Sequence, residues 1–273
     1  MQENSLCEVD IKKVQEELCS LISQFEPIHW KRILEFEPEY KAFASQVQRY
    51  PLGPFLVLLT MVGLNSYQLK GRAEDGYWPS IGACIAAAEV PDDPLQLQYV
   101  LENFYRCERL PKGKLKRLDK FLGSDLAGWL WGVDEETIRR EFGWFWKKLG
   151  LFMQQRQDAK TIVFAMKCLA MGLYMHKGSC CWDEKIAIPV DSRITAFTEE
   201  LLSVSDLEKK KIQEFWFGVA EEMQTKSIPV CMIHIGSLVW QIAGLKKQSR
   251  YQYLERIGAE ECIQLSQFKK HFC

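Results

Sequence analysis

Two lysines interrupt an almost wholly apolar helical run, AKTIVFAMKCLAMGLYM, which covers residues 159–175. Lys160 and Lys167 are seven residues apart, or two helical turns, so they share one stripe of the helix, which Tyr174 continues. Burying an ammonium costs several kcal/mol unless it is paired or loses its proton, so apolar helices rarely keep lysines. The stripe therefore predicts a helix face that lies along a cleft.

The position of Lys160 favours nucleophilic chemistry. Asp158 can cap a helix that begins near Ala159, which places Lys160 in the first turn. There the helix dipole and the apolar setting favour the neutral amine, and a protonated Lys167 on the same stripe would favour it further. A neutral lysine can attack an electrophilic carbon.

A carboxylate is available to accompany this amine. Asp191 has the position of an N-cap for an amphipathic helix over 192–203. The connection 176–190 could span about 50 Å, whereas a helix over 159–175 is only about 25 Å long, so Asp191 can return to Lys160. A capping carboxylate keeps its charge and could stabilise a positive centre. The pattern by itself favours a simpler alternative, in which Lys160 snorkels from a helix end and Asp191 only caps.

The rest of the chain predicts an all-α protein. Apolar spacing predicts helices at about 5–25, 29–48, 54–69, 95–107, 113–122, 134–150, 159–175, 192–203, 206–224 and 229–244, with one more amphipathic helix in the tail after Gly244. No run of alternating strands, no 20- to 50-residue repeat and no low-complexity linker is present. We expect one compact, bilobed helical bundle over 1–273.

Charge and composition restrict the partners. Lys and Arg total 35 and Asp and Glu total 36, so no global basic field is present and a nucleic acid would have to meet local patches. Basic residues gather at 109–120, 209–211 and 245–250, where solvated helix faces are the alternative. The chain has no heptad repeat, so a monomer is expected.

Ten cysteines, with no CxxC motif and no signal-peptide pattern, predict reduced thiols and an intracellular protein. Cys180-Cys181 has no second pair at zinc-ligand spacing, so neither a metal nor another cofactor is expected. The apolar stretch 54–64 is about half the length that a bilayer requires, so it predicts a core helix and no membrane span.

Three blocks of sequence resemble the archaeal 8-oxoguanine DNA glycosylase/AP lyase family, a divergent branch of the helix-hairpin-helix glycosylases. They are AKTIVFAMK with IPVDSRI (159–167 and 188–194), NSYQLKG followed by Glu74 and Tyr77-Trp78 (65–78), and HIGSLVW (234–240). The resemblance covers about 35–244. It implies two helical lobes with the active-site cleft between them, and a helix-hairpin-helix-like segment over about 134–204.

The resemblance implies a base-excision-repair enzyme that removes oxidised purine (8-oxoguanine) from DNA through a lysine Schiff base. Lys160 would be the nucleophile and Asp191 the essential carboxylate, and their separation of 31 residues is within one residue of the family spacing. Lys167 is the competing nucleophile, because its separation of 24 residues from Asp191 is nearer to that of the wider superfamily. The flanking AKTIVFA favours Lys160.

The resemblance also implies a base-binding set. Trp78 and Trp240 would stack on the two faces of an extruded base, as an aromatic pocket restores stacking lost from the duplex. The other members of this set are Ser66, Glu39, Lys167 and Pro189.

Two departures from the family concern this set. Glu39 stands where the family has a glutamine, and a carboxylate suits the N7–H that distinguishes the oxidised base. Gly236 replaces a family aspartate, which removes a polar contact to the base.

A third departure concerns DNA binding. Gln154–Asp158 replaces the superfamily's Gly-x-Gly hairpin, so phosphate contacts are assigned instead to basic residues, namely Lys112, Lys114, Lys116 and Arg117. The expected partner is damaged double-stranded DNA, with single-stranded DNA as an alternative, in cytoplasm and nucleoid or in a nucleus. A same-fold glycosylase for another damaged base, or a non-catalytic protein that binds damaged DNA, stays open.

Overall fold

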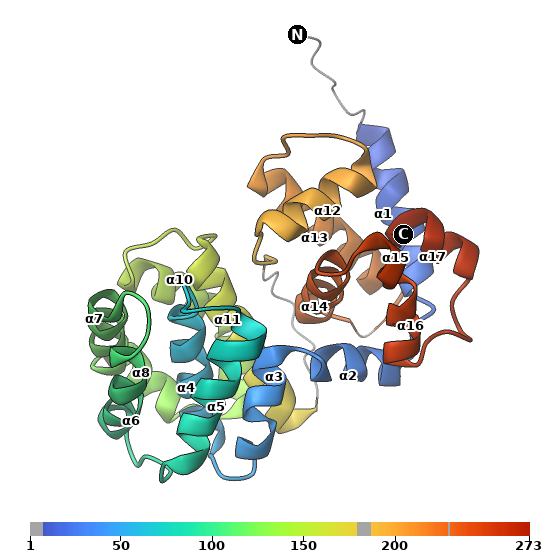
Figure 1. The fold of residues 1–273 in the computed structure, drawn as a ribbon. Helices are drawn as coiled ribbons and strands as arrows, with labels where there is room; N and C mark the ends of the chain where they lie inside the picture. The colour runs from blue at the N-terminus through green and yellow to red at the C-terminus, as the bar shows by residue number, and fades with distance from the viewer. Residues whose placement is uncertain (1–7, 179–186, 229) are drawn as a thin grey trace. The chain divides into compact units, whose positions relative to one another are not determined.

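The structure is a computed structural model that describes residues 8–178, 187–228 and 230–273 (Figure 1). These residues form helices joined by turns, with no strand among them, so the predicted all-α class is confirmed. The Cys180-Cys181 pair lies outside the described residues. The chain divides into two compact units: unit 1 contains Met1–Glu35 and Ala187–Cys273, and unit 2 contains Phe36–Ile186.

Unit 2 is built around two helices that pack along their lengths, α4 (Leu52–Leu64) and α11 (Lys160–Lys177). The predicted core helix at 54–64 lies within α4 and is buried throughout. Glycines permit the close approach, because a Cβ on Gly63 would lie 2.8 Å from Ala165 Cα and one on Gly172 would lie 2.8 Å from Leu59 Cδ1. The lysine-bearing helix is therefore fixed to the apolar centre of its unit.

The remaining elements of unit 2 surround this pair. They are α3 (Pro38–Phe43), η1 (Ala44–Gln46), η2 (Ala73–Tyr77), α5 (Trp78–Ala87), α6 (Pro94–Arg106), α7 (Pro111–Leu122), α8 (Asp125–Trp131), α9 (Glu135–Arg140) and α10 (Phe142–Phe152). The helix predicted at 29–48 is divided, because Pro38 holds the preceding Glu37 in an extended conformation (φ −60°, ψ 134°).

Unit 1 combines the start of the chain with its last third. Its helices are α1 (Glu8–Ile22), α2 (Pro27–Glu35), α12 (Ser192–Leu202), α13 (Lys209–Thr225), α14 (Met232–Ala243), α15 (Lys247–Arg250), α16 (Gln252–Ile257) and α17 (Leu265–Phe272). α1 packs on α13, and α14 packs on both α2 and α12.

The tail of the chain differs from the single helix that its pattern predicts. It forms three short helices, and Gly258, in the left-handed region at φ +70°, ends the second of them. Phe268 and Phe272 are buried, and Arg250 donates to the Glu200 carboxylate (3.0 Å) and to the Phe272 carbonyl (3.1 Å). The tail is therefore part of the core of unit 1.

Candidate active-site residues

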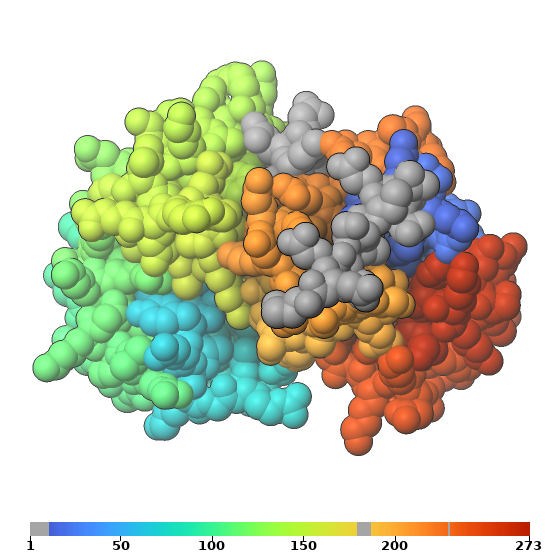
Figure 2. Space-filling model, turned by 90° about the horizontal axis from the view of Figure 1, so that it is seen from above, coloured from blue at the N-terminus to red at the C-terminus, as the bar shows by residue number. Residues whose placement is uncertain are grey.

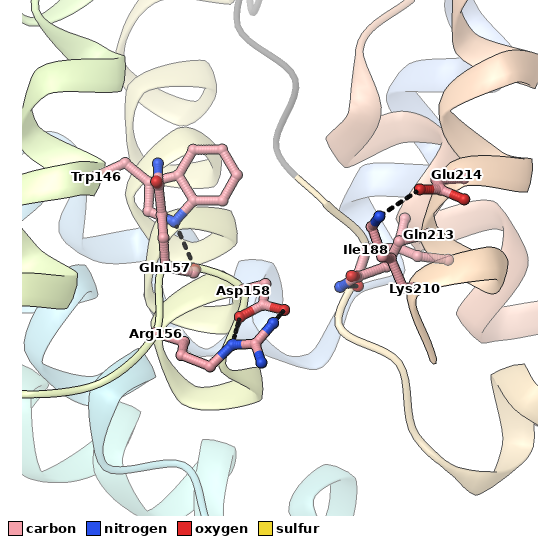
Figure 3. Close-up of polar contacts among 8 residues, drawn as sticks. All are labelled: Trp146, Arg156, Gln157, Asp158, Ile188, Lys210, Gln213 and Glu214. Carbon is pink, nitrogen blue, oxygen red and sulfur yellow. Dashed lines mark hydrogen bonds and ion pairs between the residues drawn. The ribbon is translucent and has the colours of Figure 1, made fainter. Parts of the chain in front are cut away.

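Lys160 is the first residue of α11 and is exposed. The predicted first-turn position is correct, but the apolar setting expected for Lys160 is not, because the residue is exposed. The N-cap residue is Ala159 rather than Asp158. The Asp158 carboxylate instead accepts two hydrogen bonds from the Arg156 guanidinium, at 2.9 and 2.8 Å (Figure 3). The N-cap of α11 therefore supplies no side-chain hydrogen bond to the first turn.

The turn before Lys160 is tied to α10. The Trp146 indole N–H donates to the Gln157 backbone carbonyl at 3.0 Å (Figure 3). The backbone N–H of Gln155 donates to the Gly150 carbonyl at 2.9 Å. A Cβ at position 150 would lie 3.2 Å from the Gln155 carbonyl oxygen, so glycine admits the turn. These contacts fix the start of α11. No pattern in the sequence indicates this role of Trp146.

Lys167 lies in the middle of α11 and is an ion-paired ammonium. Its Nζ is 2.6 Å from Glu37 Oε2 and 3.0 Å from Glu39 Oε1, and all three side chains are 6% exposed or less. We name these three residues the Lys167 cluster. Burial disfavours the ammonium, but the two carboxylates outweigh it and raise the pKa of Lys167. Lys167 is therefore a poor nucleophile, and its positive charge is already neutralised within the cluster.

Glu37 is the member of this cluster that the sequence did not indicate. Burial raises its pKa from 4.5 to about 7, against the opposing effect of Lys167. Two buried carboxylates facing one ammonium leave an excess negative charge, and a proton on Glu37 removes it. The predicted base-contacting residues Glu39 and Lys167 are thus in direct contact with each other.

Aromatic rings adjoin the Lys167 cluster. Trp78 is only 2% exposed, and its ring centroid lies 6.4 Å from that of Phe43 and 6.1 Å from that of Phe164. Phe164 is partly exposed and lies one turn after Lys160, with Lys167 Nζ 5.6 Å from its ring centroid. Phe164 is thus the more accessible of the two rings. Its spacing of four residues from Lys160 was the signal that could have identified it.

Other predicted residues of unit 2 have structural partners. Ser66 is half-buried, and its hydroxyl donates to the Gly63 carbonyl at 2.8 Å, at the end of α4. Lys114 is fully buried and lies 3.0 Å from the Glu108 carboxylate, and burial lowers its pKa. The prediction that Lys114 contacts a phosphate therefore needs correction, because its ammonium faces inward.

Three basic residues of α7 remain from the predicted phosphate-binding set. Arg117 is half-buried; it donates to the Leu64 carbonyl at 2.6 Å and lies over the Tyr67 ring, 4.5 Å from its centroid. Lys112 and Lys116 are exposed. Of the four predicted phosphate-binding residues, these two lysines are the exposed ones, as the prediction requires.

In unit 1, Asp191 is the N-cap of α12, as its sequence pattern predicts. Its Oδ1 accepts from the Arg193 amide at 3.0 Å and from the Ile194 amide at 3.1 Å. The side-chain amide of Gln213 holds the preceding segment by donating to the Ile188 carbonyl at 3.3 Å (Figure 3). Pro189, the next residue in the chain, is half-buried. The cap and this bond orient the carboxylate.

Two more residues of unit 1 complete this region. Trp240 is half-buried on α14, and the Arg193 guanidinium carbon lies 4.8 Å from the centroid of its ring. Arg193 Nε is also 3.8 Å from Asp191 Oδ2. We name Asp191, Arg193 and Trp240 the Asp191 cluster. Gly236 is one turn before Trp240, and a Cβ there would lie 3.4 Å from the Ile188 side chain.

Among residues 8–178, 187–228 and 230–273, no group of three or more His, Cys, Asp and Glu side chains could hold a metal ion. The helices in those ranges also include none that is both long and apolar enough to cross a membrane.

Comparison with known proteins decides the family. A family model described as AGOG, N-glycosylase/DNA lyase, matches residues 19–271. The chain belongs to the AGOG family. The match includes the tail after Gly244, consistent with the packing of that tail in unit 1. As an AGOG-family protein it is a DNA N-glycosylase with lyase activity, which confirms the predicted enzyme class and its place in DNA repair.

Two individual proteins agree with this assignment. An N-glycosylase/DNA lyase of Thermococcus kodakarensis is 28% identical over 208 residues, which cover 71% of this chain and 70% of that protein. The fold is similar to a crystal structure of an 8-oxoguanine DNA glycosylase from Pyrobaculum aerophilum, Pa-AGOG, complexed with 8-oxoguanosine. That similarity has a TM-score of 0.68 at 21% identity and covers 97% of each chain.

Proposed function

We propose that this AGOG-family enzyme removes 8-oxoguanine from duplex DNA and then cleaves the strand through an imine on Lys160. The contrast between the two lysines of α11 carries the proposal. Lys160 is exposed in the first turn, whereas Lys167 is held as an ammonium by Glu37 and Glu39. The similarity to a glycosylase crystallised with 8-oxoguanosine supports the choice of lesion.

In the proposed reaction, the Lys160 nitrogen attacks C1′ of the damaged nucleotide. The C1′–N9 bond breaks, its electron pair leaves with the base, and the base takes up a proton. The lysine nitrogen then loses one proton. The C1′–O4′ bond breaks as the C1′=N bond forms, O4′ takes up a proton, and a protonated imine results. Loss of a C2′ proton then expels the 3′ phosphate, and water hydrolyses the imine to restore the amine.

Asp191 is assigned the second role in this reaction. A carboxylate held by two backbone amides stabilises the positive charge that develops on the sugar, without being protonated itself. It also orients the attacking amine. Lys160 is the first residue of α11, and Asp191 is the N-cap of α12.

Recognition of the extruded base is assigned to the predicted set, with Phe164 added. An oxygen of Glu39, oriented by Lys167, would accept the N7–H of 8-oxoguanine, which guanine lacks. Trp240, together with the Phe164 and Trp78 rings, whose centroids lie 6.1 Å apart, would provide aromatic faces. Ser66 and Pro189 would line the base site.

A panel of substrates tests the proposal. Duplexes and single strands, each with one 8-oxoguanine, alkylated base or uracil, are assayed for base release, strand nicking and borohydride-trapped adducts. The wild type should act on 8-oxoguanine in duplex DNA. Lys160→Gln should give no trapped adduct. Lys177→Gln, at the last residue of the same helix, is the matched control and should trap normally.

Each contrary outcome has a distinct meaning. Trapping that persists in Lys160→Gln would move the nucleophile to another residue. Release of a different base, with 8-oxoguanine untouched, would overturn the lesion assignment while leaving the lysine chemistry in place. Binding of the lesion duplex without base release would favour a protein that only binds damage.

We further infer that the enzyme acts as a monomer where the cell keeps its DNA, in cytoplasm and nucleoid or in a nucleus. The two units would correspond to the two lobes of the glycosylase fold. The segment 134–204 would serve as its helix-hairpin-helix region.

A further inference from the structure

Arg193 makes two contacts that connect the parts of the Asp191 cluster. Its guanidinium carbon lies 4.8 Å from the centroid of the Trp240 ring, and its Nε lies 3.8 Å from Asp191 Oδ2. Asp191 Oδ1 is already engaged by the backbone amides of α12, so Oδ2 is the oxygen turned toward Arg193. One cation therefore lies against the proposed stacking ring and faces the proposed catalytic carboxylate.

The position of the guanidinium is defined but only partly enclosed. A Cβ on Gly244, the C-cap of α14, would lie 3.5 Å from Arg193 Nη1, so any side chain at position 244 would contact the guanidinium. The Arg193 side chain is nevertheless 43% exposed. Cation–π contacts and ion pairs at such accessible positions are weak, so other groups can replace them.

We propose that Arg193 is a gate on the Trp240 ring: it covers the ring before DNA binds and yields that face to the extruded base. This inference rests on the proposed function, because it requires Trp240 to stack on the base. A nucleic acid supplies both replacements at once. The purine offers a flat surface to the indole, and a phosphate offers the guanidinium a stronger, bidentate partner. Removal of Arg193 from the ring also releases Asp191 Oδ2.

The gate predicts effects of opposite sign on two probes. The free nucleoside 8-oxo-2′-deoxyguanosine has no phosphate, so it offers the displaced Arg193 guanidinium no anionic group. Arg193→Ala should therefore bind this nucleoside more tightly than the wild type, by about two- to fivefold, as expected for one exposed cation–π contact. A duplex with a single 8-oxoguanine should bind more weakly to the variant, and the slope of log affinity against log salt should fall by about one.

Isothermal titration measures both affinities with the full-length protein. Arg256→Ala is the matched control, because Arg256 is also an exposed arginine of unit 1 and lies over a ring, that of Tyr253, at 6.0 Å. It should change neither affinity. Arg193→Lys keeps the charge and loses the planar stack, so it should gain nucleoside affinity while retaining most of the duplex affinity. Thermal melting verifies that each variant is folded.

If neither Arg193 variant binds the nucleoside more tightly than the wild type, the gate is overturned, whatever the affinities for the duplex. Trp240→Ala separates this failure from that of the proposed function. If Trp240→Ala binds the nucleoside as well as the wild type, Trp240 does not stack on the base and the gate falls with that assignment. If Trp240→Ala loses affinity for the nucleoside and the Arg193 variants show no increase in that affinity, only the gate is wrong.

Discussion

The Lys167 cluster and the Asp191 cluster hold their charges in opposite ways. In the Lys167 cluster, side chains pair with one another and are almost fully buried. In the Asp191 cluster, the carboxylate is 18% exposed, backbone amides fix it, and its charged neighbour is 43% exposed. A buried pair cannot lose a member without stranding a charge, whereas an exposed charge can exchange partners. We infer that one cluster orders its unit and the other carries the part of the site that changes during the reaction.

The same difference divides the two lysines of α11. Lys167 is fixed in the middle of the helix by residues about 130 positions earlier in the chain, and Lys160 lies exposed at its first position. A nucleophile needs an amine that can lose its proton, and an ordering residue needs a partner that retains it. The comparison therefore predicts mainly structural effects at Lys167 and mainly catalytic effects at Lys160 and Asp191.

Lys167→Met should produce the largest change in stability. It leaves Glu37 and Glu39 buried and facing each other, which is expected to lower the free energy of unfolding by about 3–5 kcal/mol. Urea denaturation measures the loss. The control is the triple variant that combines Lys167→Met with Glu37→Gln and Glu39→Gln. It removes the stranded charges and should recover much of the lost free energy of unfolding. Similar stabilities for the single variant and the wild type would contradict the structural role of the cluster.

Asp191→Asn should have the opposite pattern of effects, with little change in stability and a large loss of activity. Asparagine caps helices about as well as aspartate, so the stability should change by less than about 1 kcal/mol. Loss of the charge should slow single-turnover base release by about 10²–10³-fold, as for loss of one electrostatic group at a transition state. Thr195→Val, which removes the hydroxyl that donates to the Asp191 carbonyl at 3.0 Å, is a control for disturbance of this turn. A near-normal rate in Asp191→Asn would remove the residue from the chemistry.

Features determined by nearby residues were predictable from the sequence. The helical class, the core helix within α4, the first-turn position of Lys160 and the Asp191 cap all follow from periodicity and capping patterns. These signals extend over one or two turns. The sequence alone did not distinguish catalytic from structural lysines, because that depends on which distant side chains face them.

The features that depend on distant contacts were not predictable from the sequence. The Lys167 cluster joins residues 130 and 128 positions apart. Lys114 belongs to the basic segment 109–120, whose composition is typical of a solvent-exposed helix. In the structure, however, the Glu108 carboxylate and the rings of Tyr67 and Tyr77 surround its ammonium group. Phe164 looks like an ordinary apolar residue in the sequence, and only its contacts with Trp78 and Lys167 relate it to the proposed base site.

The Lys167 cluster should also make stability depend on pH. The pKa of Glu37 is raised from 4.5 to about 7 by burial, so the folded protein binds a proton there more tightly than the unfolded chain does. Its contribution is fully present below pH 4.5 and is lost as the pH rises through about 7. The free energy of unfolding should fall by an amount on the order of 1–3 kcal/mol across this window. Denaturation of the wild type and Glu37→Gln at a series of pH values isolates the effect, since the decline should be smaller in the variant. Parallel pH profiles would contradict it.

The smallest effects are expected on α7, where the contrast between buried and exposed lysines recurs within one helix. Lys112 and Lys116 are exposed, whereas Lys114 between them is fully buried against Glu108. If the exposed lysines contact phosphates, Lys112→Gln and Lys116→Gln should each reduce the salt slope of duplex affinity by about one, without changing preference for the lesion. Lys114→Met should leave the slope unchanged and lower stability, because it strands the Glu108 carboxylate. Affinity measured at several salt concentrations distinguishes these outcomes, and a reduced slope in Lys114→Met would show that burial in this structure does not exclude contact with DNA.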